Sequence, residues 1–319
     1  MTSEFSIIKQ LSEQLTQKHD NALIKGIGDD CAVYDCGKGK CLLISTDTFN
    51  EGIHFTRKFS TFHDAGLKAV SAGISDIYAM GGRCAFVVIA ISVPKSMRAS
   101  DILTFYKGAE KACRKCNTVI AGGDTTASAA GFSATVTAAG FADKKKIKYR
   151  SGARPGDTVH ITGPVGYSMA GLLLLQKKMR SATGLVRQAI KQHRTPFPYT
   201  APLDLHRITS MIDVSDGLSS ELNHLARASN VRIRLDTAPL LRDPGLRTLA
   251  VRLGVSPQTL VLRSGEEYAL VFTARRGYQP GRGILTIGRV ESGPPEVYSI
   301  VNGFRNTVRS KGFDHFKPE

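Results

Sequence analysis

The sequence lacks long hydrophobic runs, which argues against a protein with membrane-spanning helices. Apolar stretches such as Phe86-Val-Val-Ile-Ala-Ile91 are far shorter than the roughly 18 to 20 residues that a membrane-spanning helix needs. The first residues, Met1-Thr-Ser-Glu-Phe5, are polar and acidic, without the basic and apolar segments of a secretory signal. We therefore expect no membrane span and a cytoplasmic location.

The signatures of conventional nucleotide-binding loops are also missing. No GxxxxGK[ST] loop occurs, and Gly26-Ile-Gly28 is not followed by the third glycine of a dinucleotide fingerprint. The signature motifs of protein kinases are absent as well. If this chain uses a nucleotide, metal ions and the backbone amides of Gly-rich turns must hold most of its phosphates.

The cysteines offer little support for a zinc site. All six lie between Cys31 and Cys116, and only Cys113-Arg-Lys-Cys116 has the spacing of zinc ligands. No second pair is present to complete four ligands. We expect reduced, mostly structural thiols rather than zinc.

Positive charge is in large excess, with 43 Lys and Arg against 27 Asp and Glu, a net charge of +16. A basic surface attracts nucleic acids and other anions. The positive residues are nevertheless spread widely, without a stacking-aromatic pattern or an RNA-binding signature. A general attraction for phosphorylated substrates explains the charge more simply, and nucleic-acid binding stays as the alternative from a different class of function.

Short apolar runs alternate with helical patterns, which predicts the α/β (α+β) class. In the first half we expect strands over 41–46, 86–93, 117–121 and 132–141, and helices over 64–80 and 100–115. On the helix over 64–80, Lys68 and Ser75 fall on the polar side. The next strand is expected over 158–162, followed by a helix that contains Leu172 to Leu175.

A polar, turn-rich segment separates two regions of this pattern. Residues 143–157 carry several charges together with Gly and Pro, which is typical of a domain boundary. We predict two domains, residues 1–148 and residues 149–319. Residues 195–202 contain three prolines and are expected to form an extended connection.

Aspartates beside glycine, serine or threonine recur along the chain. Each has an ordinary structural explanation when taken alone: Ser215 or Asp216 can cap a helix, Asp76 can lie on a helix surface, and Gly123-Asp124 can form a turn. Because five such motifs share an aspartate next to glycine, serine or threonine, we consider them together as a candidate site. The motifs are Gly28-Asp29-Asp30, Ser45-Thr46-Asp47, Ser75-Asp76, Gly122-Gly123-Asp124-Thr125 and Asp213-Val-Ser215-Asp216-Gly217.

Three of these aspartates, Asp47, Asp124 and Asp213, follow apolar, strand-like runs. We expect them at strand ends, where α/β proteins build their sites. Two carboxylates about 4 Å apart repel each other by roughly 4 kcal/mol at an effective dielectric constant of about 20, so a converging cluster needs cations. Oxygen ligands favour Mg²⁺, whose usual companion is a nucleotide polyphosphate. The residues therefore predict phosphoryl-transfer chemistry.

In this order, the motifs resemble those of the thiamine-monophosphate kinases, a family of the aminoimidazole-ribonucleotide synthetase superfamily. The resemblance covers nearly the whole chain. It is carried by Glu4–Ile8, Gly28–Val33, Ser45–Asp47, Glu51–Phe55, Ile74–Gly81, Gly122–Thr125, Arg150–Asp157, Ile212–Leu218, Ser264–Tyr268 and Gly312–Phe316.

The resemblance implies phosphorylation of thiamine monophosphate to thiamine diphosphate by ATP, through direct in-line attack of a substrate phosphate oxygen on the γ-phosphorus. A phosphate monoester is already an anionic nucleophile, so no protein general base is expected, and alignment and charge neutralisation carry the catalysis. The resemblance also implies a homodimer in which the N-terminal mixed sheets, each with helices on one face, join into a barrel. The C-terminal domain is then an α/β layered domain that completes the substrate site.

The resemblance further implies roles for individual residues, in three groups. The positions implied to bind Mg²⁺ are Asp30, Ser45, Thr46, Asp47, Asp76, Asp124, Asp213 and Asp216. Those implied to contact ATP are Tyr106, Gly123, Asp124, Arg150 and Ser215, and those implied to contact the thiamine phosphate are His54, Glu266 and Phe313. Without the resemblance, His54 would be read as a packed or surface histidine, Phe313 as a docking aromatic and Arg150 as a linker charge.

Some positions depart from the family pattern. Gly73 stands where asparagine is common, Ala269 replaces an acidic residue, and Tyr199 stands where arginine is expected. None of these changes removes an expected metal ligand, so they concern the substrate pocket more than the metal site.

Other ATP-using members of the superfamily are the main enzyme alternatives, beginning with an aminoimidazole-ribonucleotide synthetase. A selenophosphate synthetase would show a reactive cysteine or selenocysteine near the N-terminus, and none occurs between Ser3 and Lys18. A hydrogenase maturation factor of this superfamily would end in cysteine, whereas this chain ends in Phe316-Lys-Pro-Glu319.

Overall fold

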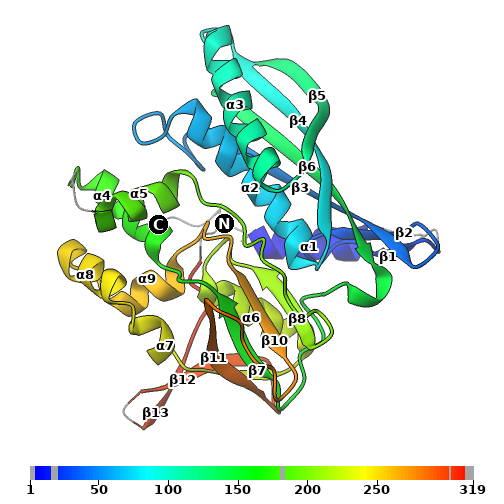
Figure 1. Cartoon of the computed structure of the whole chain (residues 1–319), viewed down its shortest axis with the longest axis vertical. Helices are drawn as coiled ribbons and strands as arrows, with labels where there is room; N and C mark the ends of the chain where they lie inside the picture. Colours follow the sequence, from blue (N-terminus) through cyan, green and yellow to red (C-terminus); the bar gives the residue numbers. More distant parts are fainter. Residues whose placement is uncertain (1–3, 16–20, 180–183, 302, 313–319) are drawn as a thin grey trace.

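The computed structural model describes residues 4–15, 21–179, 184–301 and 303–312. Two β-sheets organise this part of the chain (Figure 1), one formed by residues before 144 and the other by residues after 157. In each half of the molecule, the helices of that half pack on one face of its sheet, which confirms the α/β (α+β) class. Among the described residues, no helix combines the length and the apolar character needed to span a membrane.

The first sheet has six strands in the order β1-β2-β3-β6-β4-β5. Strand β6 lies between β3 and β4 and is antiparallel to both, while β5 runs parallel to β4 at one edge. The elements are α1 (Glu4–Gln14), β1 (Leu23–Lys25), β2 (Ala32–Asp35), β3 (Lys40–Asn50), α2 (Phe62–Ala79), β4 (Arg83–Pro94), α3 (Ala99–Lys115), β5 (Val119–Ser128), β6 (Ser133–Asp143) and the 3₁₀ turn η1 (Lys144–Lys146).

Helix α2 is held at its start by a capping box. The Thr61 hydroxyl accepts a hydrogen bond from the Asp64 amide at 3.1 Å, and the Asp64 carboxylate accepts one from the Thr61 amide at 3.0 Å. Two of the four amides that a helix start leaves unpaired are satisfied in this way. The apolar face of the helix, with Val70, Ile74 and Ile77 fully buried, packs on the sheet.

Helices α2 and α3 lie unusually close because two glycines face the opposite backbone. A Cβ atom at Gly66 would lie 1.9 Å from the Phe105 carbonyl oxygen, and one at Gly108 would lie 1.9 Å from the His63 carbonyl oxygen. No side chain larger than hydrogen fits at either position. This contact fixes α2, which carries several of the site residues, relative to α3.

The other face of the first sheet has no helix on it in the described chain. Large apolar side chains are exposed there: Tyr34 (39%), Ile44 (39%), Phe86 (37%) and Phe141 (48%). The edge strand β5 is exposed along almost its whole length. An apolar sheet face next to an open edge is the kind of surface that proteins usually cover.

The second sheet has seven strands in the order β13-β12-β9-β11-β7-β10-β8, antiparallel except for the pair β12 and β9. The remaining elements are β7 (Thr158–Thr162), α4 (Tyr167–Gln176), α5 (Gly184–Arg194), β8 (Ile208–Asp213), α6 (Leu218–Ser229), β9 (Arg232–Leu235), α7 (Ala238–Leu241), α8 (Pro244–Leu253), α9 (Pro257–Arg263), β10 (Leu270–Ala274), β11 (Ile284–Glu291), β12 (Glu296–Val301) and β13 (Phe304–Thr307).

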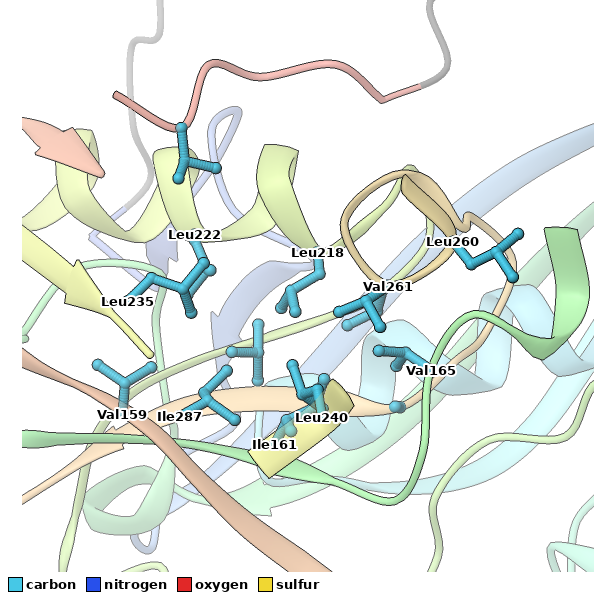
Figure 2. Close-up of a cluster of buried hydrophobic side chains, with 14 of the residues drawn as sticks. Val159, Ile161, Val165, Leu218, Leu222, Leu235, Leu240, Leu260, Val261 and Ile287 are labelled. Carbon is cyan, nitrogen blue, oxygen red and sulfur yellow. The ribbon is translucent and has the colours of Figure 1, made fainter. Parts of the chain in front are cut away.

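Helix and sheet share a large apolar core in this second part (Figure 2). Leu218 and Leu222 of α6 point toward Val159 and Ile161 of β7 and Ile287 of β11. All five side chains are fully buried, and burial of each contributes about 1.5–3 kcal/mol. This core fixes the start of α6, directly after the Asp213–Gly217 motif.

The two parts of the molecule meet where α2 packs against the edge of the second sheet. Ala79 at the end of α2 is buried in one cluster with Ile208 and Met211 of β8. Close by, the Lys148 amide donates a hydrogen bond to the Met80 carbonyl at 3.0 Å. The polar side of α2 therefore faces the other half of the molecule rather than solvent.

Candidate metal and substrate site

Three aspartates from distant parts of the sequence converge at this junction. Asp30 lies just before β2, Asp76 on the last turns of α2, and Asp213 at the end of β8. One carboxylate oxygen of each lies within 4.8 Å of the others. The contact between α2 and β8 brings them together, so this acidic cluster (Asp30, Asp76 and Asp213) belongs to both halves of the molecule.

Hydroxyl groups orient two of the three carboxylates. The Ser75 hydroxyl donates a hydrogen bond to the Asp213 carboxylate at 2.7 Å, from α2 to β8. The Ser45 hydroxyl on β3 donates to the Asp76 carboxylate. Both bonds leave the second oxygen of each carboxylate available to another ligand.

Asp30 is held by a single cationic partner on one side only. The Nε and Nη2 atoms of Arg150 donate to its Oδ1 atom at 2.9 and 2.6 Å. Its Oδ2 atom is buried and has no hydrogen-bond partner. A buried, unpaired carboxylate oxygen is costly, and a cation bound in the acidic cluster would satisfy it.

The pKa values of the acidic cluster and its neighbours also favour a bound cation. Burial, followed by the charge of Asp30, raises the pKa of Asp213 to about 8 and that of Asp47 to about 6. The same two causes raise the pKa of Asp29 to about 6. The pKa of Asp76 is raised well above its ordinary value, by burial and then by Asp47 and Asp213. Near neutral pH these carboxylates cannot all be ionised unless a cation joins them.

The oxygen donors of this cluster suit a hard divalent cation. Carboxylate and hydroxyl oxygens are the ligands that Mg²⁺ prefers, whereas zinc sites are usually built from cysteine and histidine. A bound divalent cation would pair with the buried Oδ2 atom of Asp30 and would favour the ionised form of the neighbouring carboxylates. The residues present therefore fit Mg²⁺.

Strand β3 divides its three predicted ligands between two faces of the sheet. Ser45 and Asp47 lie on the face covered by α2, and an added Cβ atom at Gly73 of α2 would lie 3.8 Å from the Asp47 carboxylate. Thr46 lies on the open face, where its hydroxyl is 3.0 Å from that of Thr137. In a single chain, the Thr46 side chain is therefore not brought to the acidic cluster.

Asp124 also lies on the open face of the sheet. It pairs with Ala90 of β4, which pairs with Thr135 of β6 and through it with Thr48 of β3, and all four share that face. Asp124 is exposed and is not part of the acidic cluster. Its assignment, like that of Thr46, stays a prediction.

The expectation that Asp47 and Asp124 end their strands is wrong, and only Asp213 ends one. Asp47 lies inside β3 and Asp124 inside β5. Both strands continue because the residues beyond the apolar runs pair with neighbouring strands through their backbones. The apolar pattern did not predict this continuation, because polar residues occupy the open face of both strands.

At the start of α6, Gly217 is the N-cap, in place of Ser215 or Asp216, which the sequence suggested as caps. The helix begins after Gly217, which makes no side-chain cap, and the Asp216 amide donates to the Glu221 carboxylate at 3.1 Å. Glu221 is 2% exposed, and burial, then Asp216 and Asp213, raise its pKa well above the ordinary value. Sequence reasoning missed this residue, and its place as the acidic residue in the first turn of α6 was the available signal.

The residues expected to contact ATP lie on different elements. Tyr106 of α3 is half-buried, with its ring 5.7 Å from that of Phe105. Gly123 allows β5 to approach β4, because a Cβ atom there would lie 1.9 Å from the Ile89 carbonyl oxygen. The Ser215 carbonyl accepts a hydrogen bond from the Glu266 amide at 2.6 Å. Of the group expected to contact ATP, only Arg150 is seen bonded to a member of the acidic cluster.

Two of the three residues expected to contact the substrate are brought together by a lysine. Lys68 of α2 forms an ion pair with Glu266 and donates to the His54 carbonyl oxygen at 3.2 Å. The His54 Nδ1 atom accepts a hydrogen bond from the Asn50 amide at 3.0 Å. Phe313 lies outside the described residues. Sequence reasoning missed Lys68, although it placed Lys68 on the same helix face as Ser75, which binds Asp213.

Comparison with known proteins identifies relatives over nearly the full length. Residues 28–142 match the family model of the AIR synthase related protein, N-terminal domain, and residues 154–287 match that of its C-terminal domain. The thiamine-monophosphate kinase of Aquifex aeolicus (strain VF5) is 32% identical over 320 residues, covering 98% of each chain. That of Bacillus subtilis (strain 168) is 35% identical over 237 residues, covering 73% of this chain and 72% of the relative.

Among solved structures, AaThiL complexed with AMPPCP and TMP is similar to this chain with a TM-score of 0.86 at 30% identity. The match covers 98% of this chain and 97% of that chain. The likeness therefore includes both sheets and the junction between them.

Proposed function

This chain belongs to the thiamine-monophosphate kinase family of AIR synthase related proteins, and we propose that it transfers the γ-phosphoryl group of ATP to thiamine monophosphate. The products are thiamine diphosphate and ADP. The observation that carries the proposal is the acidic cluster at the junction of the two halves. A similar protein that binds AMPPCP, an ATP analogue, together with TMP supports both substrates.

We propose that Mg²⁺ binds at the acidic cluster, with Ser45 and Asp47 close by. Bound Mg²⁺ neutralises phosphate charge as the phosphoryl group is transferred. The family resemblance adds Thr46, Asp124 and Asp216 as further ligands. The unpaired Oδ2 atom of Asp30 supports the assignment most directly.

Arg150 contributes a positive charge beside this site. Its guanidinium group is bound to Asp30 through Nε and Nη2 and keeps partial exposure, with 27% of the side chain accessible. A guanidinium group held in this way can donate further hydrogen bonds to an anionic ligand. We propose that it contacts the ATP phosphates, while the thiamine monophosphate itself supplies the attacking oxygen.

We also propose that the protein works as a homodimer joined through the open face of the first sheet. The exposed apolar side chains on that face, together with the bare edge of β5, support this assignment. Thr46 and Asp124 lie on the same face and would be enclosed by the partner. In this proposal residues 1–148 form the domain for ATP, Mg²⁺ and dimerisation, and residues 149–319 form the domain that completes the substrate site.

The choice of acceptor tests the proposed function. Purified protein is incubated with ATP and Mg²⁺ and with either thiamine monophosphate or thiamine, and the products are separated by chromatography. We expect thiamine diphosphate from thiamine monophosphate, and no phosphorylated product from thiamine. Phosphorylation of thiamine at a comparable rate would show that the acceptor has been assigned wrongly.

A further inference from the structure

Lys68 is a buried cation at the junction between the two halves of the molecule. Its side chain is 3% exposed, and its ammonium group lies 5.8 Å from the centre of the Phe49 ring. A buried ammonium group is costly unless it is paired and hydrogen-bonded. Its partners are the Glu266 carboxylate, which belongs to the other half, and the His54 carbonyl oxygen.

The neighbouring carboxylate, Glu267, has a different task. Its Oε1 atom accepts hydrogen bonds from the amides of Gly166 (2.7 Å) and Ser168 (2.9 Å) and from the Ser264 hydroxyl (2.6 Å). These bonds place a negative charge at the start of α4, where the helix dipole favours it. Glu267 therefore binds the start of α4, and Glu266 is the carboxylate that forms the ion pair with Lys68.

The backbone of this loop fixes the direction of Glu266. Glu266 and Tyr268 both adopt left-handed conformations, with φ of 53° and 51°, which side-chain-bearing residues rarely do. Hydrogen bonds from the Glu266 amide to the Ser215 carbonyl at 2.6 Å and from the Tyr268 amide to the Val214 carbonyl at 3.0 Å hold the loop in this shape. The Glu266 side chain is thus directed at Lys68 by the backbone on one side and by the ion pair on the other.

The ion pair is asymmetric in its exposure. The Lys68 side chain is 3% exposed, whereas that of Glu266 is 28% exposed. A cationic ligand can therefore approach the Glu266 carboxylate from solvent while Lys68 holds it from the buried side. Thiamine monophosphate carries a permanent positive charge on its thiazolium ring, which matches this arrangement.

We infer that Lys68 is a positioning residue for the acceptor substrate: it holds the Glu266 carboxylate and the His54 backbone in the geometry that receives the cationic, ring-bearing end of thiamine monophosphate. The inference rests on the proposed function. Lys68 therefore affects binding of the acceptor substrate and not binding of ATP or Mg²⁺.

Steady-state kinetics of Lys68→Met tests the inference. We expect the KM for thiamine monophosphate to rise about 10- to 100-fold, as for the loss of one or two hydrogen bonds to charged groups. The KM for ATP and the Mg²⁺ dependence should stay within about twofold, because Lys68 contacts none of the acidic cluster. Lys144→Met, which removes a 2.6 Å ion pair with Asp35 outside the site, is the matched control and should change neither KM.

A second variant and a double mutant separate positioning from support of the fold. Lys68→Arg keeps the charge but moves it, so the folded protein should still show a selective rise in the KM for thiamine monophosphate. Adding Lys68→Met to Glu266→Gln should raise that KM by less than about threefold further, since partners in one interaction are not additive. Equal rises in both KM values, wild-type kinetics in Lys68→Arg, or additive effects in the double mutant would each overturn the inference.

Failure of the proposed function would be visible separately. Wild-type turnover is measured first, and absence of thiamine diphosphate would count against the function. Calorimetric binding of thiamine monophosphate without ATP then still tests Lys68. Binding weakened by Lys68→Met but unchanged by Lys144→Met supports the positioning role, and equal binding to all three proteins contradicts it.

Discussion

Asp76 is a predicted metal ligand that we expect to lower the stability of the folded, metal-free protein. Its carboxylate is buried beside Asp47 and Asp213, and its pKa is raised well above the ordinary value. We expect Asp76→Asn to raise the thermal midpoint of the metal-free protein, by on the order of a few degrees. The amide keeps an acceptor for the Ser45 hydroxyl and removes the carboxyl group whose ionisation the neighbouring carboxylates disfavour.

Asp76→Asn should also lower kcat at least about 100-fold, because it removes a predicted metal ligand.

Asp143→Asn is the matched control for this change. Asp143 is a surface carboxylate paired with Lys40 and Lys146, and exposed pairs contribute little. Calorimetry and turnover should both stay close to wild type. If Asp76→Asn were destabilised and kept its activity, the acidic cluster would not be a metal site.

The raised pKa values also give a pH dependence with an unusual sign. The folded protein holds Asp29 and Asp47 with pKa values of about 6 and Asp213 with a pKa of about 8, all above the ordinary value near 4. The folded state therefore binds more protons than the unfolded state, and the free energy of unfolding of the metal-free protein should fall as pH rises from about 4 to about 8.

Mg²⁺ should reverse this trend because it competes with the protons. Thermal denaturation with and without Mg²⁺ should show a larger stabilisation at pH 8 than at pH 6. A stabilisation that is independent of pH across this range would mean that Mg²⁺ binds away from these carboxylates.

Single residues differ in how far the sequence reveals them. Asp30, Asp76 and Asp213 belong to motifs that share a format, and the structure brings them together. Lys68 and Glu221 have no such format, since a lysine on the polar side of a helix normally faces solvent. The Lys68 side chain is buried at the junction of the two halves, and Glu221 is buried at the start of α6 beside Asp216. Local periodicity does not predict either environment.

At the scale of elements, β4 and β5 depend on one glycine for their close approach. A Cβ atom at Gly123 would meet the Ile89 carbonyl oxygen at 1.9 Å, whereas one at Gly122 would have no atom within 4 Å. We expect Gly123→Ala to lower the free energy of unfolding by on the order of 2 kcal/mol or more. Gly122→Ala should change it by less than about 1 kcal/mol. Urea denaturation of both variants measures the difference, and similar losses would contradict the assigned contact.

The positions of elements were largely predictable from the sequence, and their ends were not. A helix expected over 64–80 is α2 (Phe62–Ala79), and strands expected over 86–93 and 158–162 are β4 (Arg83–Pro94) and β7 (Thr158–Thr162). Apolar periodicity reports which residues face the core. It does not report where pairing continues through polar residues, so β3 and β5 extend past Asp47 and Asp124.

At the scale of the whole molecule, the open face of the first sheet predicts the oligomeric state. We expect Phe141→Lys, at a side chain that is 48% exposed on that face, to convert the proposed dimer to monomers, because a buried unpaired charge is strongly disfavoured. Leu103→Lys is the control, since Leu103 is 63% exposed on α3, away from the open face. Analytical ultracentrifugation should show a monomer only for Phe141→Lys. A wild-type protein that is monomeric at micromolar concentration would refute the proposed dimer.

The order of motifs along the chain predicts the family and thereby the two-sheet architecture, while the geometry of the junction needs the structure. Ser75 and Asp213 are 138 residues apart, and no spacing rule relates them. The hydrogen bond between them exists because α2 packs on both sheets.

Metal-dependent phosphorylation of thiamine monophosphate is tested most directly by measuring turnover of ATP and thiamine monophosphate with Mg²⁺ and after chelation of divalent metal. We expect equal amounts of thiamine diphosphate and ADP with Mg²⁺, and no thiamine diphosphate once the metal is removed. Absence of thiamine diphosphate in the presence of Mg²⁺, or its undiminished formation with chelator, would contradict a metal-dependent thiamine-monophosphate kinase.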